Sequence, residues 1–377
     1  MEPSGVDLST ISLPESTRVR GFFAVLTAAL VACSPAASQS PAPVATGASP
    51  AASASAEPTG TARAIFHIAG DSPVIPRSIV PDRGAILPGA VTVESDGTYH
   101  AWIVAFGEPP GTQEIHHVTS SDAVIWTLQL DDSLASLSEG FGNPGALPAS
   151  VLEADDGWTM FMTATLETEQ EGWDIWRATA PGPDGPWARG EEPVLGRGPA
   201  GAWDAGGLDF PAVVAVEGGY ELFYSGIPSI QRETGSVGRA TSADGIEWTK
   251  HDDPETTERA FAESDPVVVP GLCGGFDERA IHQPRVVSTA SNYVMAYAGY
   301  AGDSNARPEI GYADSLDGGI TWACEWPDPA LDTSGLTGTG VHTIAAFQLG
   351  ENPALLVEWL ADDGTDVWLA EFGLGGS

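Results

Sequence analysis

Hydrophobic and polar residues follow one repeating pattern along most of the chain. Each repeat begins with an apolar strand that contains a proline, passes through a turn with Gly or Asp into an aromatic-rich strand, and ends with a third strand, a turn and a tryptophan. Alternation within residues 220–226 (YELFYSG) is typical of a strand packed between neighbouring sheets. A period of this kind predicts an array of similar sheets, each of which buries its faces against its neighbours.

Three independent landmarks keep the same period. The first strands contain Pro88, Pro148, Pro211 and Pro284. The second strands begin at Tyr99, Trp158, Tyr220 and Tyr293. The third strands lead into Trp126, Trp187, Trp248 and Trp322. Because these landmarks recur together, the sequence indicates repeated blades and not two unrelated domains.

A fifth block, at residues 341–372, supplies three strands and lacks the fourth. Near the other end of the chain, residues 71–76 (DSPVIP) repeat the pattern of the fourth strands at 191–195 and 264–268. Pairing this segment with the strand around Val367 would close the ring and cover two exposed sheet edges. The sequence therefore predicts an all-β, five-bladed β-propeller in which an N-terminal strand completes the last blade.

The turns before the tryptophans share a second motif. Residues 315–322 (SLDGGITW) fit S-x-D-x-G-x-T-W, the Asp-box known from sialidases, and residues 242–248 (SADGIEW) are a shortened version. Asp and Ser side chains can bond the turn amides, Gly can adopt positive φ, and Trp can pack the turn onto the blade. We therefore expect a structural role for these residues, far from the channel mouth.

Residues 1–62 do not follow the repeat. An apolar run at 21–32, preceded by two arginines, is too short to span a bilayer and predicts a secretion signal. It ends in LVAC at 30–33, which resembles the bacterial lipobox, so Cys33 is the expected lipid attachment site; a plain secretory signal with a chance cysteine is the alternative. Residues 34–62 are almost entirely Ser, Ala, Pro, Thr and Gly, which predicts a disordered tether.

The expected organisation is thus a signal peptide with its lipobox cysteine at 1–33, a tether at 34–62 and the propeller at 63–377. We expect a lipid-anchored protein on the outer side of a bacterial cell membrane that contacts the membrane through the anchor only. The formal charge is −37, from 52 acidic and 15 basic residues, which argues against nucleic acid as a partner. A monomer is expected.

Two further cysteines, Cys273 and Cys324, remain if Cys33 is lipidated. Outside the cytoplasm, an even pair predicts a disulfide. Two free buried thiols are the alternative.

The repeat motifs together resemble the five-bladed propeller superfamily of arabinanases, levansucrases and invertases, which includes glycoside hydrolase families 43, 32 and 130. The resemblance covers about residues 64–372 and is carried by W-D at 203–204, P-x-V at 211–213, YELFYSG at 220–226 and ATSADGIEW at 240–248. It implies a site at the channel mouth, where carboxylates on the innermost strands act as acid and base on a glycan.

At the catalytic positions the chain departs from this pattern. Leu87 stands where relatives carry the first-blade aspartate, and Ala149 stands where a family 43 member would carry another. The third blade keeps Asp209, and His282 stands near the position of the acid. The catalytic candidates are therefore Asp209 and His282, the latter as an imidazolium acid, with loop carboxylates as substitutes. Whether the chain is an enzyme stays open.

Six residues near the inner strands are candidates for substrate binding: Trp203, Asp204, Asp277, Glu278, Arg279 and Gln283. Asp204 and Asp277 could equally bond loop amides, and Trp203 is favoured as a staple between blades over a sugar-stacking face. His342 resembles a histidine that helps hold a central metal ion in family 43 arabinanases, although a core histidine is favoured. No cofactor is certain, and Ca²⁺ or another metal on the propeller axis is the open cofactor hypothesis.

Three functions are compatible with these observations. The first is a cell-surface lipoprotein with a glycoside-hydrolase-like propeller that binds glycans at the axial pocket and cleaves them if enough of the chemistry is retained. The second is a non-catalytic propeller that binds a glycan or a protein. The third is a sialidase-like protein, which would require six blades and a cluster of arginines.

Overall fold

The structure is a computed structural model that describes residues 63–107, 113–129, 134–142, 145–154, 157–167, 172–230, 234–289, 292–302, 307–324, 327–362 and 364–375. The chain divides into two compact units, Met1–Ala54 and Ser55–Ser377, and every described residue belongs to the second unit. The expected signal, lipobox and tether lie outside the described residues. None of the helices in the described ranges has the length and apolarity that crossing a bilayer requires.

The strands of the described unit form five blades, and one parallel pair, Ala85 with Thr365, joins blades 1 and 5 into a single nine-stranded sheet. Blade 1 contains β2 (Ala85–Val93), β3 (Tyr99–Phe106), β4 (Gln113–Ser120) and β5 (Thr127–Leu128). Blade 2 contains β6 (Leu147–Ala154), β7 (Gly157–Ala164), β8 (Asp174–Ala180) and β9 (Ala188–Arg189). Blade 3 contains β10 (Gly207–Val216), β11 (Gly219–Ile227), β12 (Ser236–Ser242), β13 (Thr249–Lys250) and β14 (Pro266–Val268).

Blade 4 contains β15 (Ala280–Ser288), β16 (Tyr293–Tyr300) and β17 (Glu309–Ser315). Blade 5 contains β19 (Gly340–Leu349), β20 (Asn352–Ala361), β21 (Gly364–Gly375) and β1 (Arg63–Ile68). The short β18 (Leu331–Asp332) pairs with β1, and two 3₁₀ turns, η1 (Arg77–Ile79) and η2 (Ala135–Ser138), complete the described elements.

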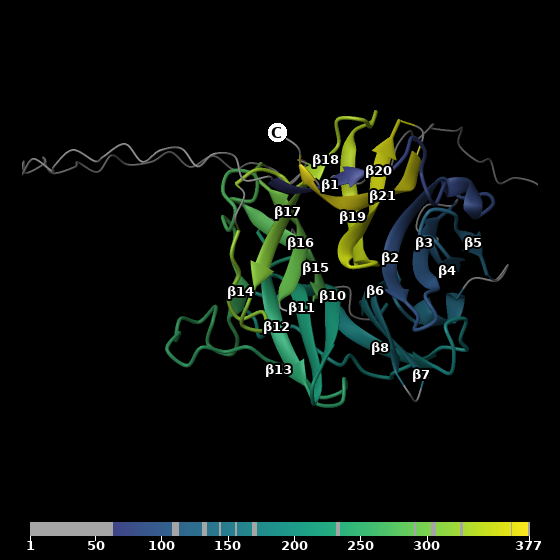
Figure 1. Cartoon of the computed structure of the whole chain (residues 1–377). Coiled ribbons are helices and arrows are strands. Elements are labelled where there is room, and N and C mark those ends of the chain that lie inside the picture. Colours follow the sequence, from purple (N-terminus) through teal and green to yellow (C-terminus); the bar gives the residue numbers. More distant parts are fainter. Residues whose placement is uncertain are drawn as a thin grey trace, which may run out of the picture. The chain divides into compact units, whose positions relative to one another are not determined.

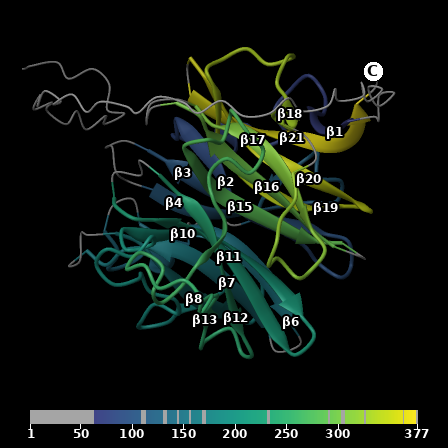
Figure 2. The same ribbon diagram turned by 90° about the vertical axis from the view of Figure 1, so that its left-hand side faces the viewer.

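The innermost strands of the five blades make a closed ring. Each contacts the next in the order β2, β6, β10, β15 and β19, and β19 contacts β2 again. The labelled strands can be followed around this ring in Figure 1, and Figure 2 shows the same strands in a view turned by 90°. The predicted all-β, five-bladed propeller is therefore confirmed. We call the end of the ring where these five strands begin the start face, and the end where they finish the end face.

An N-terminal strand completes the last blade, as predicted. Figure 1 shows purple β1 beside yellow β21, and the two strands pair from Arg63 opposite Gly375 to Ile68 opposite Ala370. The segment 71–76 continues this contact, because the amides of Val74 and Ile75 both donate to the carbonyl of Val367. The expected segment thus pairs where the sequence indicated, but β1 supplies most of the closing ladder.

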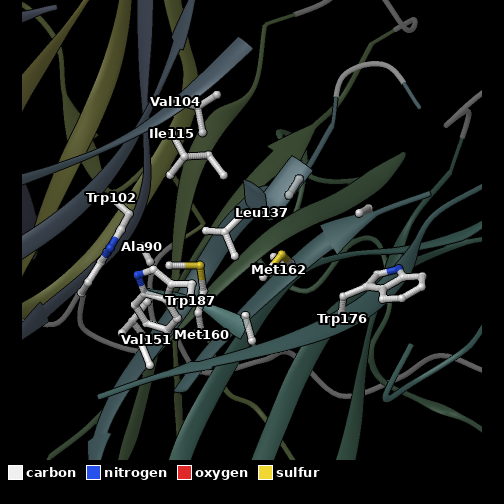
Figure 3. Close-up of a cluster of buried hydrophobic side chains, with 14 of the residues drawn as sticks. Ala90, Trp102, Val104, Ile115, Leu137, Val151, Met160, Met162, Trp176 and Trp187 are labelled. Atoms are coloured by element: carbon white, nitrogen blue, oxygen red, sulfur yellow. The ribbon is translucent and has the colours of Figure 1, made fainter. Parts of the chain in front are cut away.

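Apolar side chains fill the spaces between neighbouring blades. One cluster between blades 1 and 2 contains Trp102, Met160 and Trp187, with the Trp102 and Trp187 rings 6.0 Å apart and edge to face. Figure 3 shows Trp187 and Met160 grouped beside Trp102. The aromatic residues that mark the repeat in the sequence are therefore the contacts that hold one blade against the next.

The Asp-box turns have the structural role expected of them. The Asp317 carboxylate accepts hydrogen bonds from the amides of Ile320 and Thr321 at 3.1 and 2.9 Å and from the Thr321 hydroxyl at 2.6 Å, and these bonds lower its pKa to about 2. The Trp322 indole donates to the carbonyl of Gly319 at 3.1 Å. The predicted disulfide is also present, between Cys273 and Cys324 with their Cα atoms 5.3 Å apart.

Candidate functional site

Each inner strand carries a β-bulge at the same place in its ladder. In every blade one ladder position lies just ahead of the bulge, paired with the second strand; it is occupied by Leu87, Leu147, Asp209, His282 and Val341. In blades 3, 4 and 5 two unpaired residues follow this position, whereas in blades 1 and 2 the next residue, Pro88 or Pro148, still pairs and one residue is skipped after it. The inner strand bends at the skipped residues. The bulges surround the axis and lie in the start-face half of the ring.

A single carboxylate stands on the inner strands at these bulges. The four-residue stretches that begin at the shared position read LPGA in β2, LPAS in β6, DFPA in β10, HQPR in β15 and VHTI in β19. Asp209 is the acidic residue among them, and Leu87 holds the same ladder position in blade 1. Leu87 packs into the cluster between blades 1 and 2, which leaves no acid or base at that point.

Strand pairing also corrects one detail of the repeat. Pro88 and Pro148 stand directly after the shared position, whereas Pro211 and Pro284 stand one residue later. In blades 3 and 4 the intervening residues are Phe210 and Gln283, which take φ values of 50° and 54°. Such values are unusual for residues other than glycine and cluster at functional sites.

Asp209 is buried at 2% exposure on β10. Its Oδ1 accepts a hydrogen bond from the Phe210 amide at 3.0 Å, and that amide also donates to the Thr163 hydroxyl of blade 2 at 3.0 Å. The carboxylate therefore sits at the junction of blades 2 and 3, held by the backbone that its own bulge turns toward it. A carboxylate fixed in this way can accept hydrogen bonds from a ligand or take a proton.

His282 and Gln283 lie at the corresponding junction of blades 3, 4 and 5. The His282 ring is 7% exposed, packs edge to face on Tyr300 at 5.6 Å, and lies so close to Gly235 that a Cβ there would collide with it. The amide of Gln283 donates to the Ser225 hydroxyl at 2.8 Å, and its side chain donates to the carbonyl of His342 at 3.0 Å. Gln283 thus ties three blades together, and its side-chain nitrogen is engaged within the protein.

His342 has a partner that the sequence did not suggest. Its Nδ1 lies 2.9 Å from Oε2 of Glu358 on β20; the imidazole side chain is 47% exposed and the carboxylate is 5% exposed. Glu358 lies opposite the bulge, at the position that Tyr224 and Tyr297 hold in blades 3 and 4. An acidic residue within the apolar stretch 354–360 was the available signal. A half-exposed imidazole backed by a buried carboxylate can exchange protons with a ligand.

The described residues do not supply a complete set of metal ligands. No group of three or more His, Cys, Asp or Glu side chains gathers at ion-binding distance within the described ranges. His342 and Glu358 alone would leave a divalent cation short of the four to eight donors that it takes. An axial metal therefore stays a hypothesis, in which water would have to supply the ligands that His342 and Glu358 do not.

Asp204 and Asp277 face the interior of their blades. Asp204 is fully buried, with Lys250 Nζ 2.6 Å and the Tyr224 hydroxyl 3.4 Å from its Oδ2. Asp277, also fully buried, accepts hydrogen bonds from the amides of Cys273 and Gly274 and, at 2.7 Å, from the Tyr297 hydroxyl. Burial, and after it the neighbouring carboxylate, raises the pKa of Tyr224 and of Tyr297. Such carboxylates hold loops in place and leave no room for a sugar.

The preceding aromatic residues belong to the same structural motif. Trp203 stacks on Tyr224 at 5.8 Å and donates its indole N–H to the carbonyl of Ser264 at 2.9 Å, while Phe276 stacks on Tyr297 at 6.3 Å. Trp203 is 7% exposed, so it staples a blade, which was the favoured alternative. Of the other loop candidates, Glu278 is exposed and the Arg279 guanidinium donates to the carbonyl of Gly302.

Sequence reasoning also missed an arginine at the axis. Arg285 is 3% exposed on β15, and burial lowers its pKa to about 10 while the charge of Asp209 partly opposes that effect. The guanidinium therefore stays protonated at neutral pH. An arginine in a strand of apolar residues, in a chain with few basic residues, was the signal that could have found it.

A pocket of about 550 Å³ opens on the start face beside blade 2. It is lined by Phe141, Gly142, Thr165, Leu166, Glu167, Gly172, Trp173 and Ile230. The carbonyl of Trp173 accepts a hydrogen bond from the amide of Leu208 at 2.8 Å, so the pocket adjoins the strand residue that precedes Asp209. A half-buried tryptophan near carboxylates is a suitable surface for a sugar ring.

Comparison with solved structures finds glycoside hydrolases of the same fold. A family 117 glycoside hydrolase from the marine bacterium Zobellia galactanivorans matches with a TM-score of 0.57 and 14% identity, over 83% of this chain and 91% of its own. A member of family 130, a family of mannoside phosphorylases that contains glycoside hydrolases that target β-1,2 mannosidic linkages in Candida mannan, matches with a TM-score of 0.57 and 17% identity, over 81% of this chain and 93% of its own. A thermostable family 43 glycoside hydrolase matches with a TM-score of 0.52 and 14% identity, over 78% of this chain and 90% of its own.

These similarities confirm the resemblance at the level of fold. No protein-family model matches the chain, and no curated protein matches its sequence.

Proposed function

We propose that this protein binds glycans at the start face of its propeller and hydrolyses them slowly or not at all. The observation that carries the proposal is that Asp209 is the single carboxylate which the inner strands place at their bulges, with Leu87 in the corresponding place of blade 1. Hydrolysis of a glycosidic bond requires one group that protonates the leaving oxygen and a second that activates water or attacks the sugar. Loss of a general base alone lowers rates by roughly 10²- to 10⁴-fold.

Glycan binding is supported by a different set of features. The start-face pocket offers the Trp173 ring and the Glu167 carboxylate and adjoins the strand that carries Asp209. Apolar sugar faces stack on aromatic rings, and sugar hydroxyls donate to carboxylates. Similarity of fold to glycoside hydrolases supports the same ligand class. These features favour binding even where the catalytic pair is incomplete.

His282 and the His342–Glu358 pair are the remaining groups that could move a proton. His282 is largely buried, whereas half of the His342 side chain is exposed. If residual hydrolysis occurs, we propose that Asp209 acts as the base and that one of these imidazoles acts as the acid. Substituting His282 and His342 one at a time would show which imidazole acts as the acid.

A non-catalytic protein-binding propeller is the second candidate. Exposed apolar residues stand at the Asp-box-type turns of blades 1, 3 and 4, with Ile125 at 72%, Ile246 at 49% and Leu316 at 83% exposure. Apolar side chains on separate turns of one ring could contact a protein partner. The sialidase hypothesis required six blades, and the ring has five, so it is not proposed.

For the location of the protein, we propose a bacterial lipoprotein anchored through Cys33 on the outer side of the membrane. The lipobox-like residues 30–33 and the disulfide between Cys273 and Cys324 support an extracytoplasmic site. Labelling of expressing cells with a radioactive fatty acid should mark the wild-type protein and leave Cys33→Ser unlabelled. Equal labelling of both would contradict the anchor.

A glycan array followed by calorimetry with the strongest ligand tests the binding function. Asp209→Asn and Trp173→Ala should each weaken binding by about tenfold or more, since one removes a charged acceptor and the other removes a stacking surface. Glu255→Gln, an exposed acidic residue in a blade 3 loop, serves as the control and should bind like wild type. Equal affinity in all four proteins would show that the start face is not the binding site.

A further inference from the structure

The side chain of Arg285 reaches from blade 4 past blade 3 to blade 2. It starts from β15 in blade 4, and its Nη1 donates at 3.0 Å to the carbonyl of Ala149 on β6 in blade 2. Strand β10 lies between these two strands in the propeller. The Arg285 Cζ lies 5.2 Å from the centroid of the aromatic ring of Phe210, which β10 carries. The guanidinium is therefore surrounded by three of the five inner strands.

Most of the donors on this guanidinium have no acceptor among the described residues. An arginine presents five N–H donors, yet among the described residues its buried Nε and Nη2 have no hydrogen-bond partner. Leaving buried charged donors unpaired is costly, which makes such a group unusual unless something else meets it. The Asp209 charge acts on Arg285, but no hydrogen bond joins these two described side chains.

Arg285 lines a cavity of about 380 Å³ that opens toward the end face. All five inner strands contribute to its wall, through the residues that follow their bulges. The wall combines hydroxyl and amide side chains, namely Thr92, Ser150, Ser288 and Gln348, with apolar groups such as Val151 and Phe347. Ala215 and Ser288 are exposed at its mouth. A small polar molecule that carries one negative charge would match this lining.

We propose that this end-face cavity binds the carboxylate of a small organic acid, with the free Nε and Nη2 donors of Arg285 as its anchor. A planar carboxylate fits the guanidinium fork with two parallel, charge-assisted hydrogen bonds, whereas a neutral sugar offers no charged acceptor. The hydroxyl and amide side chains of the wall would hold the rest of the molecule. A sugar acid and a simple carboxylic acid share this chemistry. The site is separate from the start face and does not depend on the proposed glycan-binding function.

Thermal unfolding of the full chain at constant ionic strength tests the site, with sodium D-glucuronate and sodium acetate as probes, D-glucose as the neutral control and inorganic phosphate as a different oxyanion. At ten times its dissociation constant, a bound carboxylate should raise the Tm by about 2 to 5 °C. Glucose should have no effect. If neither carboxylate raises the Tm, or if only phosphate does, the proposal is wrong.

Substitutions locate the effect. Arg285→Met should abolish the shift, while Arg259→Met, which removes an exposed arginine bonded to the carbonyl of Ala200, should keep it. If Arg285→Met fails to fold, Ala215→Trp leaves the arginine intact and fills the mouth of the cavity, and it should reduce the shift. A carboxylate shift that survives unchanged in Ala215→Trp, or in a folded Arg285→Met, would overturn the assignment.

Discussion

The Lys250 ammonium lies 2.6 Å from the Asp204 carboxylate, which is fully buried in blade 3. Lys250 is the one lysine of the chain. In blade 4 the corresponding Asp277 accepts two amides and a tyrosine hydroxyl. The two blades thus use the same aromatic-Asp motif, but only blade 3 among the described residues supplies it with a full counter-charge.

Lys250→Met should destabilise the protein by about 3 to 5 kcal/mol, because removal of one partner leaves a buried charge uncompensated. Urea unfolding of wild type and variant measures the difference. The double variant Lys250→Met with Asp204→Asn should lose less than the single one, since the amide carries no charge. A single variant within about 0.5 kcal/mol of wild type would show that the pair does not stabilise blade 3.

The disulfide between Cys273 and Cys324 closes a loop with a sequence separation of 51. On the chain-entropy model, such a loop contributes about 4 kcal/mol. Cys273→Ala with Cys324→Ser should therefore unfold at markedly lower urea concentration than wild type, and dithiothreitol should lower the stability of the wild type alone. Identical midpoints with and without the reductant would contradict this contribution.

Removal of residues 64–77 should unfold the propeller. The deletion takes away nearly all of β1 and the Val74 and Ile75 contacts with Val367, which leaves β21 with an unpaired edge in blade 5. Circular dichroism and limited proteolysis report the loss. A chain shortened by residues 34–60, which retains β1, is the control and should melt like the full chain. An unchanged melting curve for the 64–77 deletion would refute closure by this strand.

Stability should decrease as the pH falls below about 6.5. Burial lowers the pKa of His116 and His117, although Glu114 and Asp184 partly oppose it. In the unfolded chain these two histidines bind protons at about pH 6.5, whereas in the folded chain they bind them only at lower pH. The free energy of unfolding therefore falls as the pH decreases from about 6.5 toward the lower pKa values of the folded state. Asp317, with a pKa of about 2, affects stability only below about pH 4.

Urea unfolding at pH 7.5 and 5.5 measures this dependence. The difference should be smaller in His117→Gln and unchanged in His251→Gln, a partly exposed histidine of blade 3. If the free energy of unfolding falls equally between pH 7.5 and 5.5 in wild type and His117→Gln, His117 makes no contribution.

The repeat could be predicted from the sequence because each blade carries the same proline, aromatic and tryptophan landmarks, and the missing strand could be found because residues 71–76 repeat that pattern. The site could be predicted only in part. Asp209 and His282 share a ladder position, as their places in the repeat suggested. Asp204 and Asp277 looked equally suited to a ligand, because burial and hydrogen-bond partners depend on contacts with strands about 20 residues away.

Other residues of the site depend on long-range contacts that no local pattern reveals. Arg285 meets Ala149 across 136 residues of sequence. Glu358 approaches His342 only because β19 bends at its bulge. The sequence pattern also did not show that, relative to the shared ladder position, Pro211 stands one residue later than Pro88. Strand pairing shows this offset.

Hydrolysis of a panel of aryl glycosides by wild type and Leu87→Asp tests the central claim most directly, with binding of the same sugars measured in parallel. The account predicts that wild type binds with turnover near background and that Leu87→Asp, which puts a carboxylate at the ladder position of blade 1 that Asp209 holds in blade 3, raises turnover above background. Robust wild-type turnover that persists in Asp209→Asn would contradict it, because the chemistry would then reside away from the five bulges.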